Sequence, residues 1–599
     1  MRRAINLGAG VAAIVAIAVV VASAQNRIDA VSPYAPELAA YGEHSVGVRT
    51  IVVIDHNRPD ILHTANGQPT ARADRALTLE VWYPAAADVS GASHEYRTIL
   101  RDPSVPITLV GRAGRDLPPT ATGAPFPLVV ISHGYPGNRL LMSHLGENLA
   151  SKGYVVAAID HPESTYDDQK AFGSTLYNRP LDQRFAVDAI GALSAGASGS
   201  FLAGLVDVTR TAIVGYSMGG YGVLNVVGGA YRPAAASLPG APPNQLLLEH
   251  TAGHAAFKAR MDDTRIKAAV AIGPWGMPAG FWDATGLAGI RIPVLFVAGS
   301  ADDVSGYETG TRAIFEAAVN ADRFLLTYLN ANHNAGAPIP APVEAWTYSK
   351  TLTSFPFVHY ADAVWDTTRM NNVLAHFATA FLDLRLKDVA ARRAYLDVVP
   401  RGSDGVYAVD RDGAFQPTHT YWKGFKRATA TGLVMEHRAA GEGGPAGDGV
   451  FKRLAPGQRE SVPQWVVDAV GKAGMSDRFV IDPRLNPFLQ HGDFDGDGRL
   501  DVALLVRAAG STKTGVAILH RATGRVFLLG AGSPGARLGD DFTWMDAWSV
   551  FDKGPVEQGA TDERPPILRG DALLLAKSES ASGLLWWTGT TYRWYQQGD

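Results

Sequence analysis

The sequence predicts a doubly wound α/β domain with a mostly parallel sheet, followed by a smaller β-rich domain. Apolar runs of four to seven residues alternate with helical patterns along the first part of the chain. Such runs are too short for helices, and continuous apolar residues are typical of strands buried on both faces of a parallel sheet. Repeated alternation of strand and helix indicates a doubly wound fold. Towards the C-terminus, short β-like runs continue after a glycine-rich break.

The N-terminus has the parts of a signal peptide. Two arginines precede an apolar run at about 7–21, and the small residues at 22–24 end it. This pattern predicts a signal peptide over 1–24, cleaved before Gln25, and therefore a secreted or periplasmic protein. An uncleaved anchor is the alternative, because 5–24 is just long enough to span a bilayer. No basic stop-transfer cluster follows, so we expect cleavage and no stable membrane span after it.

The α/β domain is expected over residues 25–436. Two β-rich runs at 46–54 and 77–83 open it, with turn-prone sequence between them as in a hairpin or a long loop. The buried strands that follow are expected at 128–131, 154–159, 211–214, 266–272, 294–297 and 324–328. Helical patterns occur near 143–152 and 181–193, from Met218 onward and at 368–386. The last of these has its apolar residues on one stripe and is expected to close the domain.

A linker is expected at 437–449, where the run from Gly441 to Gly449 is too rich in glycine to hold regular structure. Residues 450–599 then form a separate β-rich accessory domain. No repeat with a period of 20–50 residues is visible, so a solenoid is not indicated.

Composition excludes several classes of function. The net charge is −4 and no run of five or more basic residues occurs, so a nucleic-acid partner is not expected. The chain has no cysteine. Disulfides, thiolate metal sites, iron–sulfur clusters and cysteine nucleophiles are therefore excluded.

The most informative motif is Gly-Tyr-Ser-Met-Gly at 215–219, between a four-residue apolar strand and the start of a helix. A serine on a tight strand-to-helix turn adopts a strained backbone, and the flanking glycines allow close chain approach. The motif predicts Ser217 as a nucleophile. The amide of Met218 is expected to form one half of an oxyanion hole, and the amide of Tyr135, in the loop 132–137, the other half.

A serine nucleophile needs a base and an acid that orients it. The strand at 294–297 leads to Asp302, and the strand at 324–328 leads to His333, the histidine directly after it. Asp302 is preferred to Asp303 as the acid because it lies three residues after a glycine. The alternatives are that Asp302 caps a helix and that His333 is an ordinary loop histidine.

Three segments carry a family resemblance: Ser-His-Gly-Tyr-Pro-Gly at 132–137, the run 149–161, and Gly-Tyr-Ser-Met-Gly-Gly at 215–220. Over about 41–435 the chain resembles the α/β-hydrolases related to platelet-activating-factor acetylhydrolase and bacterial dienelactone-hydrolase-like esterases. The resemblance implies hydrolysis of small-molecule or lipid carboxylic esters through a Ser-Asp-His triad and an acyl-enzyme, with no cofactor for catalysis. Two departures stand out: dienelactone hydrolases use a cysteine, and Tyr216 precedes the nucleophile where the acetylhydrolases usually have histidine.

Other functions stay open at this point. The chain could be a lipase, a phospholipase A2-type acetylhydrolase or a peptidase, and the region 220–265 is expected to form the cap that decides between them. A different class is a catalytically inactive surface-binding module, against which the intact triad argues.

An acidic loop near the C-terminus predicts a calcium site. It places carboxylates at loop positions 1, 3, 5 and 9, a spacing of hard oxygen ligands that suits Ca²⁺. The expected ligands are Asp493, Asp495, Asp497, the Arg499 carbonyl and Asp501. Position 12 is Leu504 rather than the glutamate of an EF-hand, and the pattern resembles the calcium loops of FG-GAP and related β-repeats. We expect a structural ion; the alternative is an Asp/Gly-rich turn without metal.

Overall fold

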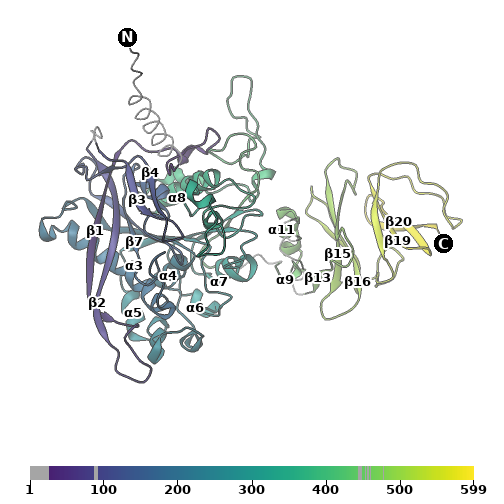
Figure 1. Ribbon diagram of the computed structural model, residues 1–599. Coiled ribbons are helices and arrows are strands. Elements are labelled where there is room, and N and C mark those ends of the chain that lie inside the picture. Colours follow the sequence, from purple (N-terminus) through teal and green to yellow (C-terminus); the bar gives the residue numbers. More distant parts are fainter. Residues whose placement is uncertain are drawn as a thin grey trace, which may run out of the picture. The chain divides into compact units, whose positions relative to one another are not determined.

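The computed structural model of the chain describes residues 26–86, 92–442, 448–451, 454, 458, 461–475 and 478–598. It consists of two compact units, Met1–Glu442 and Gly443–Asp599 (Figure 1). The predicted signal peptide at 1–24 and residues 443–447 of the predicted linker lie outside the described residues. The first unit continues past the predicted boundary at 436, because the residues just before Glu442 form the last strand of its sheet.

The first unit is built on one ten-stranded sheet, in the order β12-β11-β10-β9-β8-β6-β7-β2-β1-β5. Its strands are β1 Ser45–Pro59, β2 Arg72–Ala85, β5 Gly114–Arg115, β6 Phe126–Ser132, β7 Val155–Asp160, β8 Val206–Tyr216, β9 Ile266–Ile272, β10 Val294–Gly299, β11 Arg323–Tyr328 and β12 Leu433–Arg438. All neighbours from β7 to β11 are parallel. The predicted doubly wound, mostly parallel α/β sheet is confirmed.

Antiparallel strands flank this parallel centre. β1 and β2 pair as a long antiparallel hairpin along one side of the unit (Figure 1), and β2 also pairs with β7. At the opposite edge β12 pairs antiparallel with β11. A separate two-stranded ribbon consists of β3 (Glu95–Ile99) and β4 (Pro106–Val110).

Helices cover both faces of the sheet. They are α2 Ser143–Ala150, α3 Phe172–Ser194, α4 Met218–Val226, α5 Ala255–Met261, α6 Ala284–Leu287, α7 Ala313–Ala317 and α8 Thr367–Leu386. Alternate residues of one strand enter two different cores: Val129 packs with α2 and α8, and Val130 packs with α3 and α4. This period of two explains the continuous apolar strands, since both faces are buried. No helix in the described part of the chain has the length and apolarity needed to cross a bilayer.

The second unit contains two antiparallel sheets. The first has β13 Phe479–Ile481, β14 Leu489–Gly492, β15 Asp501–Ala508, β16 Thr514–Leu519 and β17 Val526–Gly530; the second has β18 Ala547–Phe551, β19 Ala572–Lys577, β20 Ala581–Trp587 and β21 Tyr592–Gly598. Side chains of both sheets, among them Leu505, Val516, Leu573 and Trp587, share one buried core. Two helices, α9 (Asp448–Phe451) and α11 (Gln464–Lys472), precede the sheets. The predicted β-rich C-terminal region is confirmed.

Candidate active site

Ser217 occupies the turn between β8 and α4, with φ 54° and ψ −113°. A positive φ is unusual for a residue with a side chain and stores strain at this turn. The neighbouring glycines are required sterically. A Cβ on Gly219 would lie 2.0 Å from the Ser132 carbonyl oxygen, and a Cβ on Gly215 would lie 2.4 Å from the Gly219 backbone. The Gly-x-Ser-x-Gly spacing therefore follows from how closely the chain approaches itself here.

Asp302 and His333 form a buried pair at the same edge of the sheet. The Nδ1 atom of His333 lies 3.0 Å and 2.9 Å from the two carboxylate oxygens of Asp302. One of those oxygens also accepts the backbone N–H groups of Val304 and Ser305. Burial favours the neutral acid, but the bond and charge of His333 and these two N–H groups outweigh it, so the pKa of Asp302 is lowered. The ionised Asp302 holds the Nδ1–H tautomer of His333, which leaves Nε2 as the basic nitrogen.

A cavity of about 470 Å³ brings the predicted residues together. Ser217, His333 and Tyr135 all line it. Asp302 itself is buried, and the cavity wall continues with its neighbour Asp303. These residues follow the carboxyl ends of β6, β8, β10 and β11, where loops of a parallel sheet converge to form ligand sites. A larger cavity, of about 750 Å³, lies near the opposite ends of these strands and contains none of the predicted catalytic residues; the chemistry, rather than the volume, selects the smaller one.

The two residues predicted for the oxyanion hole flank the nucleophile. Met218 is the first residue of α4, where backbone N–H groups have no partner within the helix. The loop that carries Tyr135 comes close to the elbow, since a Cβ on Gly134 would lie 3.2 Å from the Cβ of Ser217. An amide from each segment is thus available near the serine.

The sequence did not indicate the hydrogen bonds that hold the loop of His333 in place. The Tyr216 hydroxyl donates to Asn334 Oδ1 at 2.9 Å, and its ring centroid lies 5.1 Å from that of His333. The Asn334 side-chain amide in turn donates to the carbonyls of Val358 and Ala361. Tyr216, which marks a departure from the acetylhydrolases, therefore fixes the loop that carries the histidine. The only signal in the sequence is the position of both residues next to triad members.

The cavity wall comes from a different segment than expected. Residues 352–359, which lie between β11 and α8, supply Leu352, Phe355 and His359 to the lining. The region 220–265, predicted as a cap, contributes no lining residue to this cavity, although the structure describes all of it. Several of its residues line the larger cavity instead.

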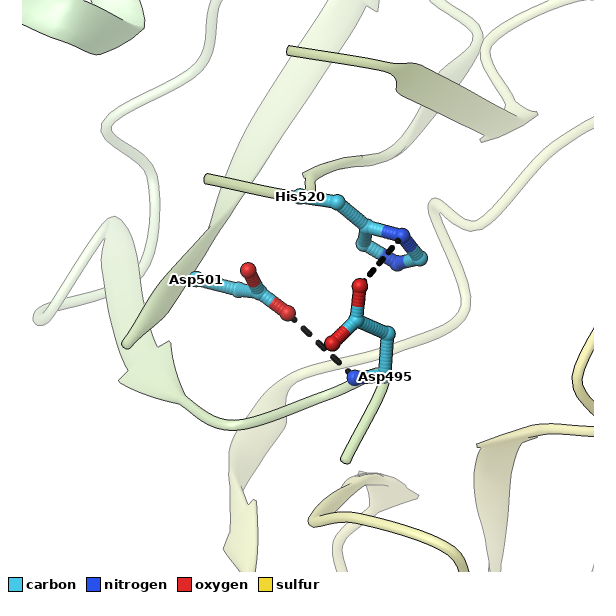
Figure 2. A group of neighbouring side chains, drawn as sticks. All are labelled: Asp495, Asp501 and His520. Atoms are coloured by element: carbon cyan, nitrogen blue, oxygen red, sulfur yellow. Dashed lines mark hydrogen bonds and ion pairs between the residues drawn. The ribbon is translucent and has the colours of Figure 1, made fainter. Parts of the chain in front are cut away.

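In the second unit, the acidic loop folds into two overlapping groups of possible metal ligands. Asp493, Asp495 and Asp497 each offer an oxygen within 4.8 Å of the others, and Asp495, Asp501 and His520 do the same. Figure 2 shows Asp495 between Asp501 and His520, with its carboxylate 3.2 Å from Nδ1 of the histidine. His520 lies far along the chain from the loop, so the sequence pattern could not identify it.

Crowding of charge makes this loop suited to a cation. Burial and the nearby charges of Asp495 and Asp497 raise the pKa of Asp501 to about 7, although the backbone N–H of Arg521 opposes the shift. The Asp501 carboxylate also accepts the backbone N–H groups of Phe494 and Asp495, and so stabilises the conformation of the acidic loop. A divalent cation on these hard oxygen donors would relieve the repulsion between the carboxylates.

The sheet, the strained serine elbow and the Asp–His pair define an α/β-hydrolase fold. Residues 101–246 match the family model described as PETase, PET hydrolase-like. Cutinase est1 of Thermobifida alba is 26% identical over 208 residues, which are 35% of this chain and 53% of that protein. A platelet-activating factor acetylhydrolase of Canis lupus familiaris is 45% identical over 47 residues, or 8% of this chain and 11% of that protein.

Among solved structures, a ferulic acid esterase from Streptomyces cinnamoneus matches with a TM-score of 0.41 at 20% identity, over 61% of this chain and 94% of that one. The chain spans about half the length of the cutinase and about a tenth of the acetylhydrolase. The predicted resemblance to α/β-hydrolase esterases is confirmed for the first unit.

Proposed function

We propose that the first unit is a serine hydrolase that cleaves carboxylic esters. The observation that carries the proposal is the pairing of His333 with the ionised Asp302 beside a serine at a strained elbow, with His333 and Ser217 in one cavity. The cutinase and acetylhydrolase relatives support it, since their names place them among enzymes of ester chemistry.

The residues have the following roles in the proposed reaction. Ser217 Oγ attacks the ester carbonyl while His333 Nε2 takes its proton, and Asp302 stabilises the imidazolium that forms. The amides of Met218 and Tyr135 stabilise the oxyanion. His333 then protonates the leaving alcohol, and water, deprotonated by the same histidine, hydrolyses the acyl-enzyme to acid and free serine.

The substrates are proposed to be small-molecule or lipid esters, acted on outside the cytoplasm after removal of the segment 1–24. A lipase or phospholipase A2-type acetylhydrolase is the closest alternative, and an inactive binding module is the alternative of another class. Hydrolysis of a chain-length series of 4-nitrophenyl esters, with an aminoacyl amide as control, separates the enzymatic alternatives.

Replacement of the nucleophile tests the proposal. Loss of one triad member typically lowers kcat by about four orders of magnitude. We expect Ser217→Ala to lose ester hydrolysis and labelling by a fluorophosphonate probe, while Ser200→Ala, on a distant loop, retains both. Wild-type protein that is folded yet neither hydrolyses esters nor takes the label would favour the binding module.

For the second unit we propose a structural Ca²⁺ ion. Asp493, Asp495 and Asp497 would hold it together with the Arg499 carbonyl, and Asp501 would complete the set of oxygen ligands. The ion would neutralise the loop and supply no chemistry to ester cleavage.

A further inference from the structure

One arginine lines the active-site cavity without a partner. Arg101, just beyond β3, shares the cavity wall with Ser217 and His333, and it is half-buried. Its backbone N–H donates to the hydroxyl of Tyr360 at 3.0 Å, which fixes the chain at this point. Within the part of the chain that the structure describes, its guanidinium makes no hydrogen bond and no ion pair.

Neither Asp102 nor Asp303 forms an ion pair with this guanidinium among the described residues. Asp102 uses one carboxylate oxygen for the N–H and hydroxyl of Ser104 and the other for the hydroxyl of Ser349. Asp303, the acidic residue of the cavity wall, is exposed and forms no ion pair with Arg101 among the described residues. Hydrogen bonds from Ser349 and Ser104, and to a smaller extent the charge of Arg101, lower the pKa of Asp102. The cavity therefore contains a cation that interacts with a carboxylate at a distance but has no ion-pair partner in the described part of the chain.

Apart from Asp102, the groups that feel the charge of Arg101 are neutral. Burial raises the pKa values of Tyr135 and Tyr166, so both stay phenols at neutral pH. Burial, followed by the charge of Arg101, lowers the pKa of His359. The hydroxyl of Tyr166 lies 3.0 Å from Nε2 of this neutral histidine. A guanidinium without a hydrogen-bond partner offers five N–H donors in a planar fork that matches a carboxylate.

We propose that Arg101 is an anion subsite, and that the preferred substrates are esters that carry a free carboxylate away from the scissile bond. The inference rests on the proposed ester hydrolysis at Ser217. A single cation without an ion-pair partner balances at most one negative charge, which favours a carboxylate over a phosphate dianion. A substrate in the cavity would place its ester at Ser217 and its carboxylate at Arg101, and the two products together would carry one more carboxylate than the substrate.

Matched ester pairs test the subsite. On the acyl side, mono-4-nitrophenyl adipate is compared with 4-nitrophenyl hexanoate, which has the same number of acyl carbons. On the alcohol side, 4-acetoxybenzoate is compared with its methyl ester. Wild-type protein is expected to favour the anionic member of at least one pair, and raised salt should weaken that preference because it screens the charge.

Arg101→Gln is expected to lower kcat/KM for the favoured anionic ester about 10- to 100-fold, mainly through KM, since hydrogen bonds between charged groups are lost. The neutral member of the pair should change less than about threefold, which also shows that the variant is folded. Arg101→Lys keeps the charge but not the planar set of N–H donors, so its kcat/KM for the anionic ester should lie between those of wild type and Arg101→Gln. Asp303→Asn, which removes the negative charge from the same wall, should strengthen the preference.

Two outcomes overturn the subsite alone. Either Arg101→Gln changes both members of each pair equally, or the wild type shows no preference for an anionic ester. In both cases loss of activity in Ser217→Ala would leave the proposed function standing. If Ser217→Ala keeps hydrolysing the neutral esters, the proposed function itself is wrong and the subsite falls with it.

Discussion

The backbone of Ser217 is held in its strained conformation by bonds on both sides. Its N–H donates to the Ile272 carbonyl at 2.8 Å, and its own carbonyl accepts the N–H groups of Tyr221 and Trp275. These contacts come from β9, α4 and the loop after β9, so relaxing the turn would break bonds to three parts of the domain. A strained residue persists only when its surroundings determine it in this way.

At the residue scale, the assignment of the acid can be tested directly. We expect Asp302→Asn to lower kcat for a neutral ester by about four orders of magnitude, because the amide neither holds the correct tautomer of His333 nor stabilises its imidazolium. Steady-state kinetics with a 4-nitrophenyl ester measures the effect. Asp303→Asn is the matched control and should stay within about tenfold of wild type. The reverse result would move the acid to Asp303.

The residues proposed as a triad could be named from the sequence because each follows a recognisable strand in the order that the fold imposes. Ser217 lies in a local motif, and Asp302 and His333 follow the next buried strands. Arg101 was not predictable, because nothing in its sequence neighbourhood shows that it shares a cavity with Ser217. Its role depends on contacts that are local neither in sequence nor in one element.

At the element scale, a buried ion cluster joins the β1–β2 hairpin to α3. Arg75 of β2 contacts Asp182 of α3 with two bonds, Nε to Oδ1 at 2.8 Å and Nη2 to Oδ2 at 3.0 Å. Arg58 of β1 and His161 also contact this carboxylate, which is fully buried. The sequence predicted the helix, but it placed Arg58 and Arg75 in turn-prone sequence between two shorter β-rich runs, and it did not show which charges would meet.

Breaking this cluster should cost far more than breaking an exposed pair on the same helix. Asp182→Asn removes the carboxylate that two buried guanidinium groups share and leaves Arg75 with Glu163 and Arg58 with Asp55. It is expected to lower the free energy of unfolding by about 3 kcal/mol. Asp188→Asn is the control, since Asp188 is 56% exposed and pairs with Arg265 at the surface; its effect should be about 0–1 kcal/mol. Urea unfolding of both variants measures the difference. Equal effects would show that the cluster does not stabilise the hairpin.

At the scale of the whole molecule, the first unit contains five buried histidines held neutral. They are His133, His144, His161, His250 and His376. Burial is the main cause that lowers each pKa, to about 4 for His144 and to about 3 for His161 and His376, with His133 and His250 well below the ordinary value. In the unfolded chain all five return to an ordinary value of about 6.5.

These histidines predict a loss of stability in mild acid. Between the folded and unfolded pKa values the unfolded chain binds more protons, so the free energy of unfolding falls as the pH drops below about 6.5. Each such histidine contributes a slope of up to about 1.4 kcal/mol per pH unit. Urea unfolding at pH 5, 6, 7 and 8, followed through the unfolding transition of the first unit, measures this slope. His144→Gln should flatten the curve and the exposed His63→Gln should not.

The calcium proposal also concerns the whole chain, because it makes the stability of the second unit depend on Ca²⁺ while the activity proposed for the first unit does not. An ion that binds only the folded form stabilises it by about 2.7 kcal/mol at a hundredfold excess over its Kd. Chelation should therefore lower the melting temperature of the second unit in calorimetry and leave ester hydrolysis intact. The double variant Asp495→Ala/Asp497→Ala should no longer respond to chelation. A loss of hydrolysis on chelation would contradict the separation.

The two units and their fold classes were predictable from the spacing of apolar runs, which reports burial on one or both faces. The source of the cavity wall was not. The sequence pointed to 220–265, whereas the lining comes from 352–359, since the path of an irregular connection depends on tertiary contacts that leave no periodic pattern.

The connection between β11 and α8 adds no strand to the sheet. The side-chain amide of Asn334, next to His333, donates to the Val358 carbonyl and so holds the connection to the loop of His333. Changes within the connection can therefore alter what enters the cavity while the sheet that holds Ser217, Asp302 and His333 stays the same. In the proposed hydrolase, evolution can vary selectivity here without rebuilding the reactive centre. For engineering, this makes the connection a replaceable module: a library confined to residues 352–359 would explore new substrates on an unchanged catalytic frame.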